Sequence, residues 1–227
     1  MNIAQKFAPY FKVLYEDNHL IAVDKVAGIL VQPDTSQDPS LADMVTEYIR
    51  LKYSKQGNVF CGVIHRNDRP VSGLILMAKT SKMLSRMNEL FRNGDVQKTY
   101  LALVYRKPKN DEDILIHWLK KDVKKNFAIC YTRETDGSQR AELSFKIINH
   151  TTTGYLLEIQ PKTGRFHQIR AQLSKIGCPI IGDLKYGYET PNEDKSVCLH
   201  GWKAAFVHPV QNVPVMIETS LPQWACL

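Results

Sequence analysis

Residues 59–78 have the sequence VFCGVIHRNDRPVSGLILMA, and this stretch decides the fold. Apolar runs at its two ends have the length and composition of strands. The polar loop between them, residues 65–72, sets one acid, Asp68, between two arginines and close to a histidine. Loops held by rigid strands are where reactive side chains usually sit, so we expect this loop to carry function.

Helices are predicted on both sides of this stretch in the sequence. Apolar residues at helical spacing predict helices at about residues 39–54, 80–94 and 167–176. Asp38 followed by Pro39 predicts the start of the first helix, with an N-cap and then proline at the first helical position.

Strand patterns fill most of the remaining chain. They fall at residues 13–15, 20–23, 98–105, 114–119, 126–131, 141–148, 154–160, 197–207 and 213–218. Short turns join many of these neighbours, which favours antiparallel pairing. We therefore predict an α+β fold with a mixed, mainly antiparallel central sheet and flanking helices. No linker-like stretch divides the chain, so a single domain over residues 1–227 is expected.

The net charge of +7 on the 227 residues is unevenly distributed. Residues 1–49 carry a net −4, residues 50–175 a net +13 and residues 176–227 a net −2. A basic middle suits a nucleic-acid-binding face, and a lysine-rich solvated surface is the plain alternative. The five cysteines show no C-x-x-C spacing, and the chain has no apolar leader and no long apolar run, which predicts a cytoplasmic protein of a reducing compartment.

Asp68 is the first candidate for chemistry. The flanking guanidinium groups of Arg66 and Arg69 favour its ionised form, so it suits the role of nucleophile or base rather than general acid. The alternative is a turn in which Asp68 only accepts hydrogen bonds from backbone amides.

Two further segments carry side chains suited to nucleic acid. Tyr100 lies on a predicted strand, on the same side as Lys98, and a tyrosine can stack on a base while offering its hydroxyl. A later turn crowds Arg165, His167 and Arg170 at a helix start, where cations and backbone amides suit phosphate or a carboxylate. A half-buried strand tyrosine and a basic helix start are the structural alternatives.

Motifs of several enzyme classes are missing from the sequence. It has no G-x-x-x-x-G-K-[ST], no G-x-G-x-x-G and no G-x-S-x-G, which argues against nucleotide hydrolysis, dinucleotide redox chemistry and α/β-hydrolase activity. The histidines and cysteines do not fall at metal-ligand spacings, so no metal site is expected.

Taken together and in order, five segments resemble the RluA-type family of pseudouridine synthases. The family pattern H-R-x-D-R-x-x-S-G is met at residues 65–73, K-x-Y-x-A-L-V at 98–104 and T-G-R-x-H-Q-I-R at 163–170. An opening D-K-x-A-G and a closing L-H also match, at residues 24–28 and 199–200. The resemblance runs from about residue 13 to residue 218.

The resemblance implies a fold and a reaction. The family's fold is an elongated, mainly antiparallel sheet with a central RNA-binding cleft, and the separate N-terminal RNA-binding domain of many relatives is expected to be missing here. The reaction isomerises uridine in ribosomal or transfer RNA to pseudouridine: the N-glycosidic bond breaks, the uracil turns over and a C–C bond forms at C5. The reaction involves no redox change, so no cofactor is expected. We expect no membrane partner, and we expect the protein to be a monomer.

The resemblance also implies roles for single residues. Asp68 would be the catalytic carboxylate, Tyr100 would stack on a flipped-out uracil and act in the closing proton abstraction, and Arg170 would pair with Asp68. Whether Asp68 attacks the uracil, attacks the ribose C1′ or promotes loss of the 2′ proton stays open. The expected RNA contacts are Arg66, which would fill the vacated stack, and Arg69, Lys98, Arg165 and His167.

The chain departs from the family pattern at a few positions. Asn67 and Val71 stand where Leu and Thr are usual, Val26 replaces a Pro, and Phe166 replaces a small hydroxyl residue. None removes a group that the chemistry needs, so activity is expected while the modified uridine stays open. A non-catalytic RNA-binding or ribosome-assembly module is the alternative from another class. A retaining-type glycosidase is disfavoured, because the motifs contain no second carboxylate.

Overall fold

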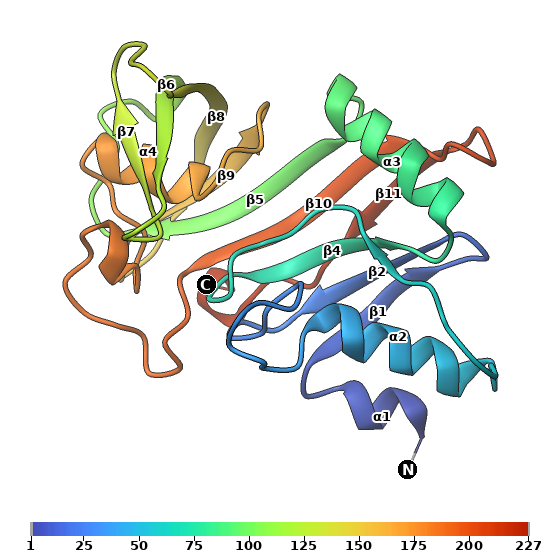
Figure 1. Ribbon diagram of the computed structural model, residues 1–227. Helices are drawn as coiled ribbons and strands as arrows, with labels where there is room; N and C mark the ends of the chain where they lie inside the picture. Colours follow the sequence, from blue (N-terminus) through green and yellow to red (C-terminus); the bar gives the residue numbers. More distant parts are fainter. Residues whose placement is uncertain (1, 227) are drawn as a thin grey trace. The chain divides into compact units, whose positions relative to one another are not determined.

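The computed structural model describes residues 2–226 and divides into two compact units (Figure 1). The first unit comprises the chain up to Val96 together with Gly201–Ser220. The second unit comprises Gln97–His200 together with the segment that starts at Leu221. Within the described residues, no helix is both long enough and apolar enough to cross a membrane.

The sheet of the first unit is built on β4 (Ser72–Ala78), the strand that follows the Asp68 loop. Strand β1 (Phe11–Glu16) pairs antiparallel with β2 (Leu20–Lys25), and β2 pairs antiparallel with β4. Strand β2 pairs with β4 from Gly73 to Ala78, so the short β3 (Gly62–Val63) pairs with the last two residues of β4 on its other edge, which it shares with β10. The prediction of a strand over residues 59–64 was therefore too long.

Two helices cover opposite faces of β2 and β4. Alternate residues of each strand pack against α2 (Leu41–Lys52), and the intervening residues pack against α3 (Ser81–Asn93). Burial on both faces explains why the sequence of β4 is a continuous apolar run. The predicted second helix is confirmed, with Thr80 as N-cap and Gly94 in the left-handed conformation at its end.

The start of α2 differs from the prediction. Ser40, and not Asp38, is the N-cap: its hydroxyl accepts a hydrogen bond from the Asp43 amide, and the Asp43 carboxylate accepts one from the Ser40 amide. This capping box satisfies two amides at once, which a cap at Asp38 cannot do. Asp38 forms an ion pair with Arg69 instead, with 2.8 Å between Oδ2 and Nη1.

Two glycines let β10 (Leu199–Val207) lie against β4 in the first unit. A Cβ added to Gly73 would lie 2.3 Å from the Gly201 carbonyl oxygen and 2.5 Å from its nitrogen, and Gly73 has a φ of +107°. The glycine that closes the Asp68 loop is thus required by packing and by backbone conformation. Strand β10 continues antiparallel into β11 (Pro214–Glu218).

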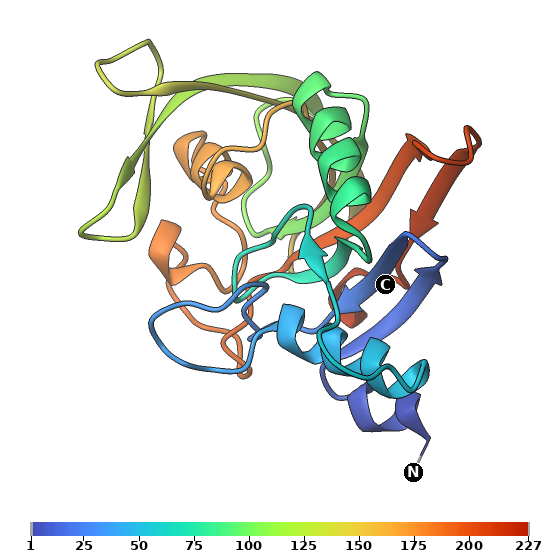
Figure 2. The ribbon, with the colours of Figure 1, turned by 45° about the vertical axis from the view of Figure 1, so that its right-hand side comes forward.

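The second unit is an antiparallel sheet that curves around one helix. Its strands follow the order β5 (Gln97–Val104), β9 (Tyr155–Pro161), β8 (Gln139–His150), β6 (Glu112–Asp122) and β7 (Phe127–Tyr131). Figure 2 shows the orange helix α4 beside the curled strands of this unit.

Helix α4 (Gln168–Lys175) buries Ile169 and Leu173, as its apolar spacing predicts, whereas Ile176 just after the helix is half-buried. On another face of the helix, Ala171 packs against Leu119, Ala128 and Ala141 of this sheet. The remaining short helices are α1 (Ile3–Phe7), η1 (Leu184–Tyr186) and η2 (Gln223–Ala225). The predicted α+β fold, with a mixed, mainly antiparallel sheet and flanking helices, is confirmed.

Replacing Gly73 with alanine tests the close approach of the two strands. We expect Gly73→Ala to lower the free energy of unfolding by about 3 kcal/mol or more, because the methyl group overlaps backbone atoms and the φ is unfavourable for alanine. Urea denaturation measures the change. Gly94→Ala is the control, since its φ is also positive but the space around it is open, and its cost should stay at about 1–2 kcal/mol. Equal losses in the two variants would contradict the packing argument.

Candidate active site

The loop that carries Asp68 is braced by the segment after β2. Gly28 and Arg69 form two reciprocal hydrogen bonds: the Gly28 amide donates to the Arg69 carbonyl at 2.8 Å, and Arg69 Nε donates to the Gly28 carbonyl at 2.9 Å. The Arg69 guanidinium also forms the ion pair with Asp38. Arg69, expected as an RNA contact, therefore serves first to hold two loops together.

Lys25 lies beneath the same loop and is almost fully buried. Its Nζ donates to the carbonyls of Val26 and Ile29 at 3.0 Å and to that of Arg69 at 3.4 Å. Burial lowers the pKa of Lys25 to about 7, while the negative charges of Asp68 and Asp24 act in the opposite direction. The ammonium group thus ties the loop backbone together and adds positive charge near Asp68.

Two other side chains of the loop also have structural roles. His65 Nε2 accepts a hydrogen bond from the Leu76 amide at 3.1 Å, and its ring stacks on Phe91. Asn67 is buried and donates from Nδ2 to the Ser72 carbonyl at 3.4 Å. Between these anchors, the Asp68 side chain is half-buried and the Arg66 side chain is exposed. The Asn67 amide thus binds the backbone at the end of the loop.

Arg170, the third expected catalytic residue, lies in the second unit and is held by Asp183. Its Nε and Nη2 donate to the two carboxylate oxygens of Asp183, both at 2.7 Å. The side chains are 5% and 1% exposed, so this is a buried bidentate ion pair. The Tyr186 ring lies under the guanidinium, with 5.0 Å between its centre and Cζ.

Asp183 and Lys25 are the two residues of the site whose importance the sequence does not reveal. Lys25 lies in the D-K-x-A-G segment at residues 24–28, and no role was expected of either residue. The available signal is a charged residue inside an apolar stretch, at Leu20–Lys25 and at residues 178–183. The expected pairing of Arg170 with Asp68 stays a prediction, and Asp68 belongs to the first unit.

The turn that precedes α4 is organised by the buried Gln168. Its Oε1 accepts hydrogen bonds from the Thr163 hydroxyl at 2.7 Å and from the Arg165 amide at 2.9 Å. Its Nε2 donates to the Glu142 carbonyl at 3.0 Å. The exposed Arg165 donates from Nε to the Arg140 carbonyl at 3.0 Å, which orients its guanidinium along the strand edge.

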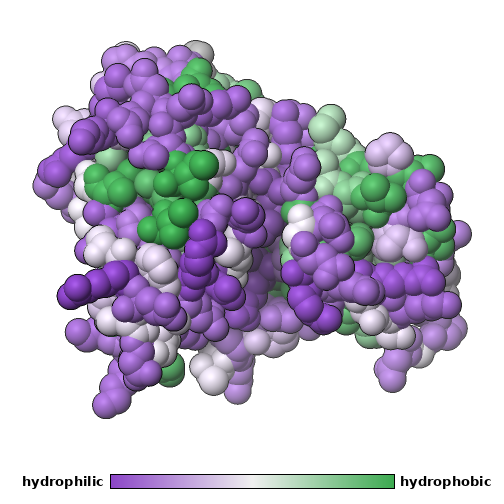
Figure 3. Space-filling view, turned by 90° about the horizontal axis from the view of Figure 1, so that it is seen from above, coloured by the Kyte–Doolittle hydropathy of each residue, from purple (hydrophilic) through white to green (hydrophobic). Residues whose placement is uncertain are grey.

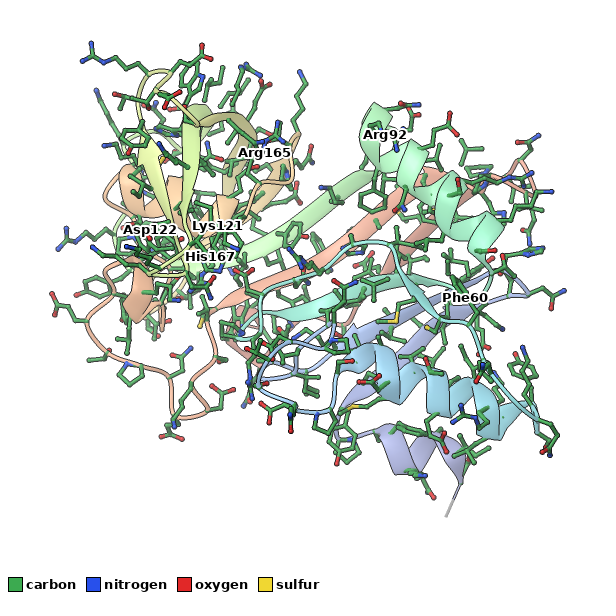
Figure 4. All side chains as sticks on the ribbon, viewed as in Figure 1. Phe60, Arg92, Lys121, Asp122, Arg165 and His167 are labelled. Atoms are coloured by element: carbon green, nitrogen blue, oxygen red, sulfur yellow. The ribbon has the colours of Figure 1, made fainter. Side chains whose placement is uncertain are left out.

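His167 connects this turn to Tyr186. It has a φ of +51°, and its Nδ1 lies 2.9 Å from the Tyr186 hydroxyl. Its ring stacks on Phe166, with 3.7 Å between the ring centres. Figure 4 shows His167 and Arg165 in the second unit. His167, expected as an RNA contact, is therefore also a structural link between the turn and the ring under Arg170.

Lys98 and Tyr100 occupy alternate positions of β5, as the strand pattern predicts, and both are half-buried. Burial lowers the pKa of Lys98. A Cβ added to Gly164 would lie 3.8 Å from Lys98 Nζ, so the ammonium group lies against the turn that contains Arg165. The fold therefore brings together two of the sequence motifs, at residues 98–104 and 163–170, within one unit.

The chain is similar to known proteins over most of its length. The family model described as RNA pseudouridylate synthase matches residues 19–175. The tRNA pseudouridine synthase C of Vibrio cholerae is 29% identical over 230 residues, covering 93% of this chain and 91% of the relative. The ribosomal large subunit pseudouridine synthase C of Rickettsia bellii is 30% identical, covering 99% of this chain and 72% of the relative.

A solved structure supports the fold. Human RNA pseudouridylate synthase domain containing 4 matches with a TM-score of 0.79 at 20% sequence identity. The match covers 98% of this chain and 92% of that chain. The similarity therefore includes both units described above.

The low pKa of Lys25 predicts how stability changes with pH. The unfolded chain keeps the Lys25 proton up to the ordinary pKa of 10.5, whereas the folded chain releases it at about 7. Between these values the unfolded state binds more protons, so raising the pH favours the folded state, by up to about 1.4 kcal/mol per pH unit. We expect the unfolding free energy of the wild type to rise with pH relative to Lys25→Met over this window.

Denaturant titrations at several pH values between about 7 and 10 measure this difference. Lys12→Met removes an exposed lysine from the neighbouring strand and should leave the slope of the wild type unchanged. Parallel curves for the wild type and Lys25→Met would contradict the shifted pKa.

Proposed function

The chain belongs to the RNA pseudouridylate synthase family, a family of isomerases, and on this premise we propose that it converts a uridine in RNA to pseudouridine. The resemblance to RluA-type enzymes that the motifs indicate is confirmed. Similar relatives are named for transfer RNA and for ribosomal RNA, so the proposed substrate is a uridine in one of these two classes. Hydrophilic residues cover most of the face seen in Figure 3, and hydrophobic residues gather in a few patches.

The observation that carries the proposal is the construction of the Asp68 loop. His65 and Asn67 bind backbone groups of the loop and its strand, and Arg69 binds the neighbouring segment. The half-buried Asp68 is thus presented by a loop whose other polar side chains hold its shape. Lys25 is close enough to Asp68 for their charges to interact, since the negative charge of Asp68 acts to raise the pKa of Lys25.

The proposed reaction balances without any co-reactant. The bond between N1 and C1′ breaks, the uracil rotates, and a bond forms between C5 and C1′. The proton on C5 is then removed, and N1 gains one. Asp68 is the proposed catalytic carboxylate, acting on a base flipped out of its helix, because a stacked base is out of reach. Tyr100 stacks on the uracil and takes part in removing the C5 proton.

Arg170 is the proposed partner of Asp68. Its bond to Asp183 uses Nε and Nη2, which fixes the plane of the guanidinium and directs Nη1 away from Asp183. An arginine fixed in this way keeps a facing carboxylate ionised and oriented without reorganisation during the reaction. The proposed RNA contacts are Arg66, Arg69, Lys98, Arg165 and His167.

A non-catalytic RNA-binding module is the second candidate. The net charge of +13 over residues 50–175 favours RNA binding whether or not a reaction follows. The two candidates differ in whether pseudouridine appears in RNA that the protein binds.

Replacing Asp68 with asparagine separates the candidates. We expect Asp68→Asn to bind RNA but to lower the rate of pseudouridine formation by about 1,000-fold or more, since the amide cannot replace an ionised carboxylate. The assay incubates pure protein with total RNA from cells that lack it and quantifies pseudouridine by nucleoside chromatography. Asp95→Asn, at an exposed carboxylate after α3, should keep the wild-type rate. Wild-type rates in Asp68→Asn would refute the assignment, and tight binding without product from the wild type would favour the module.

Tyr100→Phe tests the role of the tyrosine hydroxyl. The ring that stacks on the uracil is kept, so RNA should bind within about twofold of the wild type. Turnover should fall by about 100-fold because the hydroxyl that takes part in proton removal is lost. Single-turnover kinetics with saturating enzyme measure the step. Equal rates for the two proteins would leave the tyrosine a stacking residue only.

A further inference from the structure

A stack of aromatic and cationic side chains leads from the surface of the second unit to Arg170. Lys121 Nζ lies 4.4 Å from the centre of the Phe166 ring, and this ring stacks on His167. His167 bonds through Nδ1 to the Tyr186 hydroxyl, and the Tyr186 ring lies under the Arg170 guanidinium. Lys121 and His167 are labelled in Figure 4. A continuous series of side-chain contacts thus runs from the Lys121 ammonium to the proposed catalytic arginine.

The link between Lys121 and this stack depends on a residue in which the chain departs from its family. Phe166 stands where the family pattern has a small hydroxyl residue. A small residue has no ring that could attract an ammonium group or pack on His167. The contact between β6 and the turn before α4 therefore depends on the Phe166 ring.

Lys121 lies on β6 and is exposed. Among residues 2–226, no carboxylate comes within ion-pair distance of its Nζ. The adjacent Lys120 instead donates to the Asp136 carbonyl, and the adjacent Asp122 accepts from the Lys125 amide. Lys162, on the neighbouring turn, forms an ion pair with Glu142. Lys121 thus presents a positive charge that is held in place by a ring and is open to solvent.

We propose that Lys121, held by Phe166, binds a phosphate of the RNA strand beside the target uridine. This inference rests on the proposed function, because it takes Arg170 as the site of the target base. Phosphate contacts fix the register of a nucleic acid on a protein, and a side chain held in place before binding loses less conformational entropy. The stack therefore sets where the strand lies relative to Arg170, which makes Phe166 a positioning residue.

Lys121→Ala tests the phosphate contact directly. The loss of one phosphate contact should raise the Kd for substrate RNA about fivefold and reduce the slope of log Kd against log salt by about 1. Filter binding at several KCl concentrations measures both quantities. Lys124→Ala is the matched control, because Lys124 lies at the turn between β6 and β7 and its ammonium lies over none of the aromatic rings in residues 2–226. Its Kd should stay within about twofold of the wild type.

Phe166→Thr restores the residue type of the family and tests the ring. We expect a Kd about threefold above the wild type, and Lys121→Ala should have a smaller effect in this background than alone, because the two residues act together. Phe166→Tyr keeps the ring and should bind like the wild type. Thermal unfolding of each variant separates a loss of binding from a loss of folded protein.

Two outcomes would overturn the inference. One is the same Kd and salt slope in Lys121→Ala as in Lys124→Ala, which would mean that the hairpin acts only through its overall charge. The other is full additivity of Lys121→Ala and Phe166→Thr, which would mean that the ring does not hold the lysine for binding. Failure of the proposed function has a different signature, since the wild-type protein would then form no pseudouridine in any RNA.

Discussion

The buried ion pair between Arg170 and Asp183 is the constraint on which the second unit depends. Neither charge can be buried alone, because removing an isolated charge from water costs many kcal/mol. The bidentate geometry therefore ties the first turn of α4 to the segment that leads into η1. Tyr186 lies under the guanidinium and stacks on Phe127, so the same pair is packed against the sheet. The guanidinium cannot turn without losing its hydrogen bonds to Asp183 and its contact with the Tyr186 ring.

The first unit uses a buried cation in a similar way. Lys25 donates to three backbone carbonyls of two loops, one of which carries Asp68. In both units, a charge that is costly to bury fixes the backbone or side chain next to a proposed catalytic residue. Groups fixed before the substrate arrives need not reorganise during the reaction, which helps a site to stabilise developing charge.

Local patterns in the sequence predicted most of the secondary structure. They failed where two residues could serve as the N-cap of a helix, or where the pairing of a strand depends on distant parts of the chain. The prediction of a helix that starts after Thr80 and ends before Gly94 was correct, because the N-cap threonine and the C-terminal glycine each act on backbone groups within a few residues. The N-cap of α2 was wrong because Ser40 and Asp43 form a reciprocal cap that outcompetes Asp38. The predicted strand over residues 59–64 was too long, since its pairing depends on which strands flank β4, which periodicity does not show.

Some residues of the proposed site could be identified from the sequence, and others could not. The motifs identified Asp68, Tyr100 and Arg170 as candidates, but Asp183 and Lys25 act through contacts with residues 13 and 44 positions away, which no motif records.

A crystal structure of the protein bound to a uridine-containing RNA is the most direct test of the central claim. We expect the Asp68 carboxylate within about 3 Å of Arg170 Nη1 and beside a flipped-out uracil that stacks on Tyr100. An RNA-bound structure with Asp68 and Arg170 more than about 8 Å apart, and with the uracil elsewhere, would contradict it.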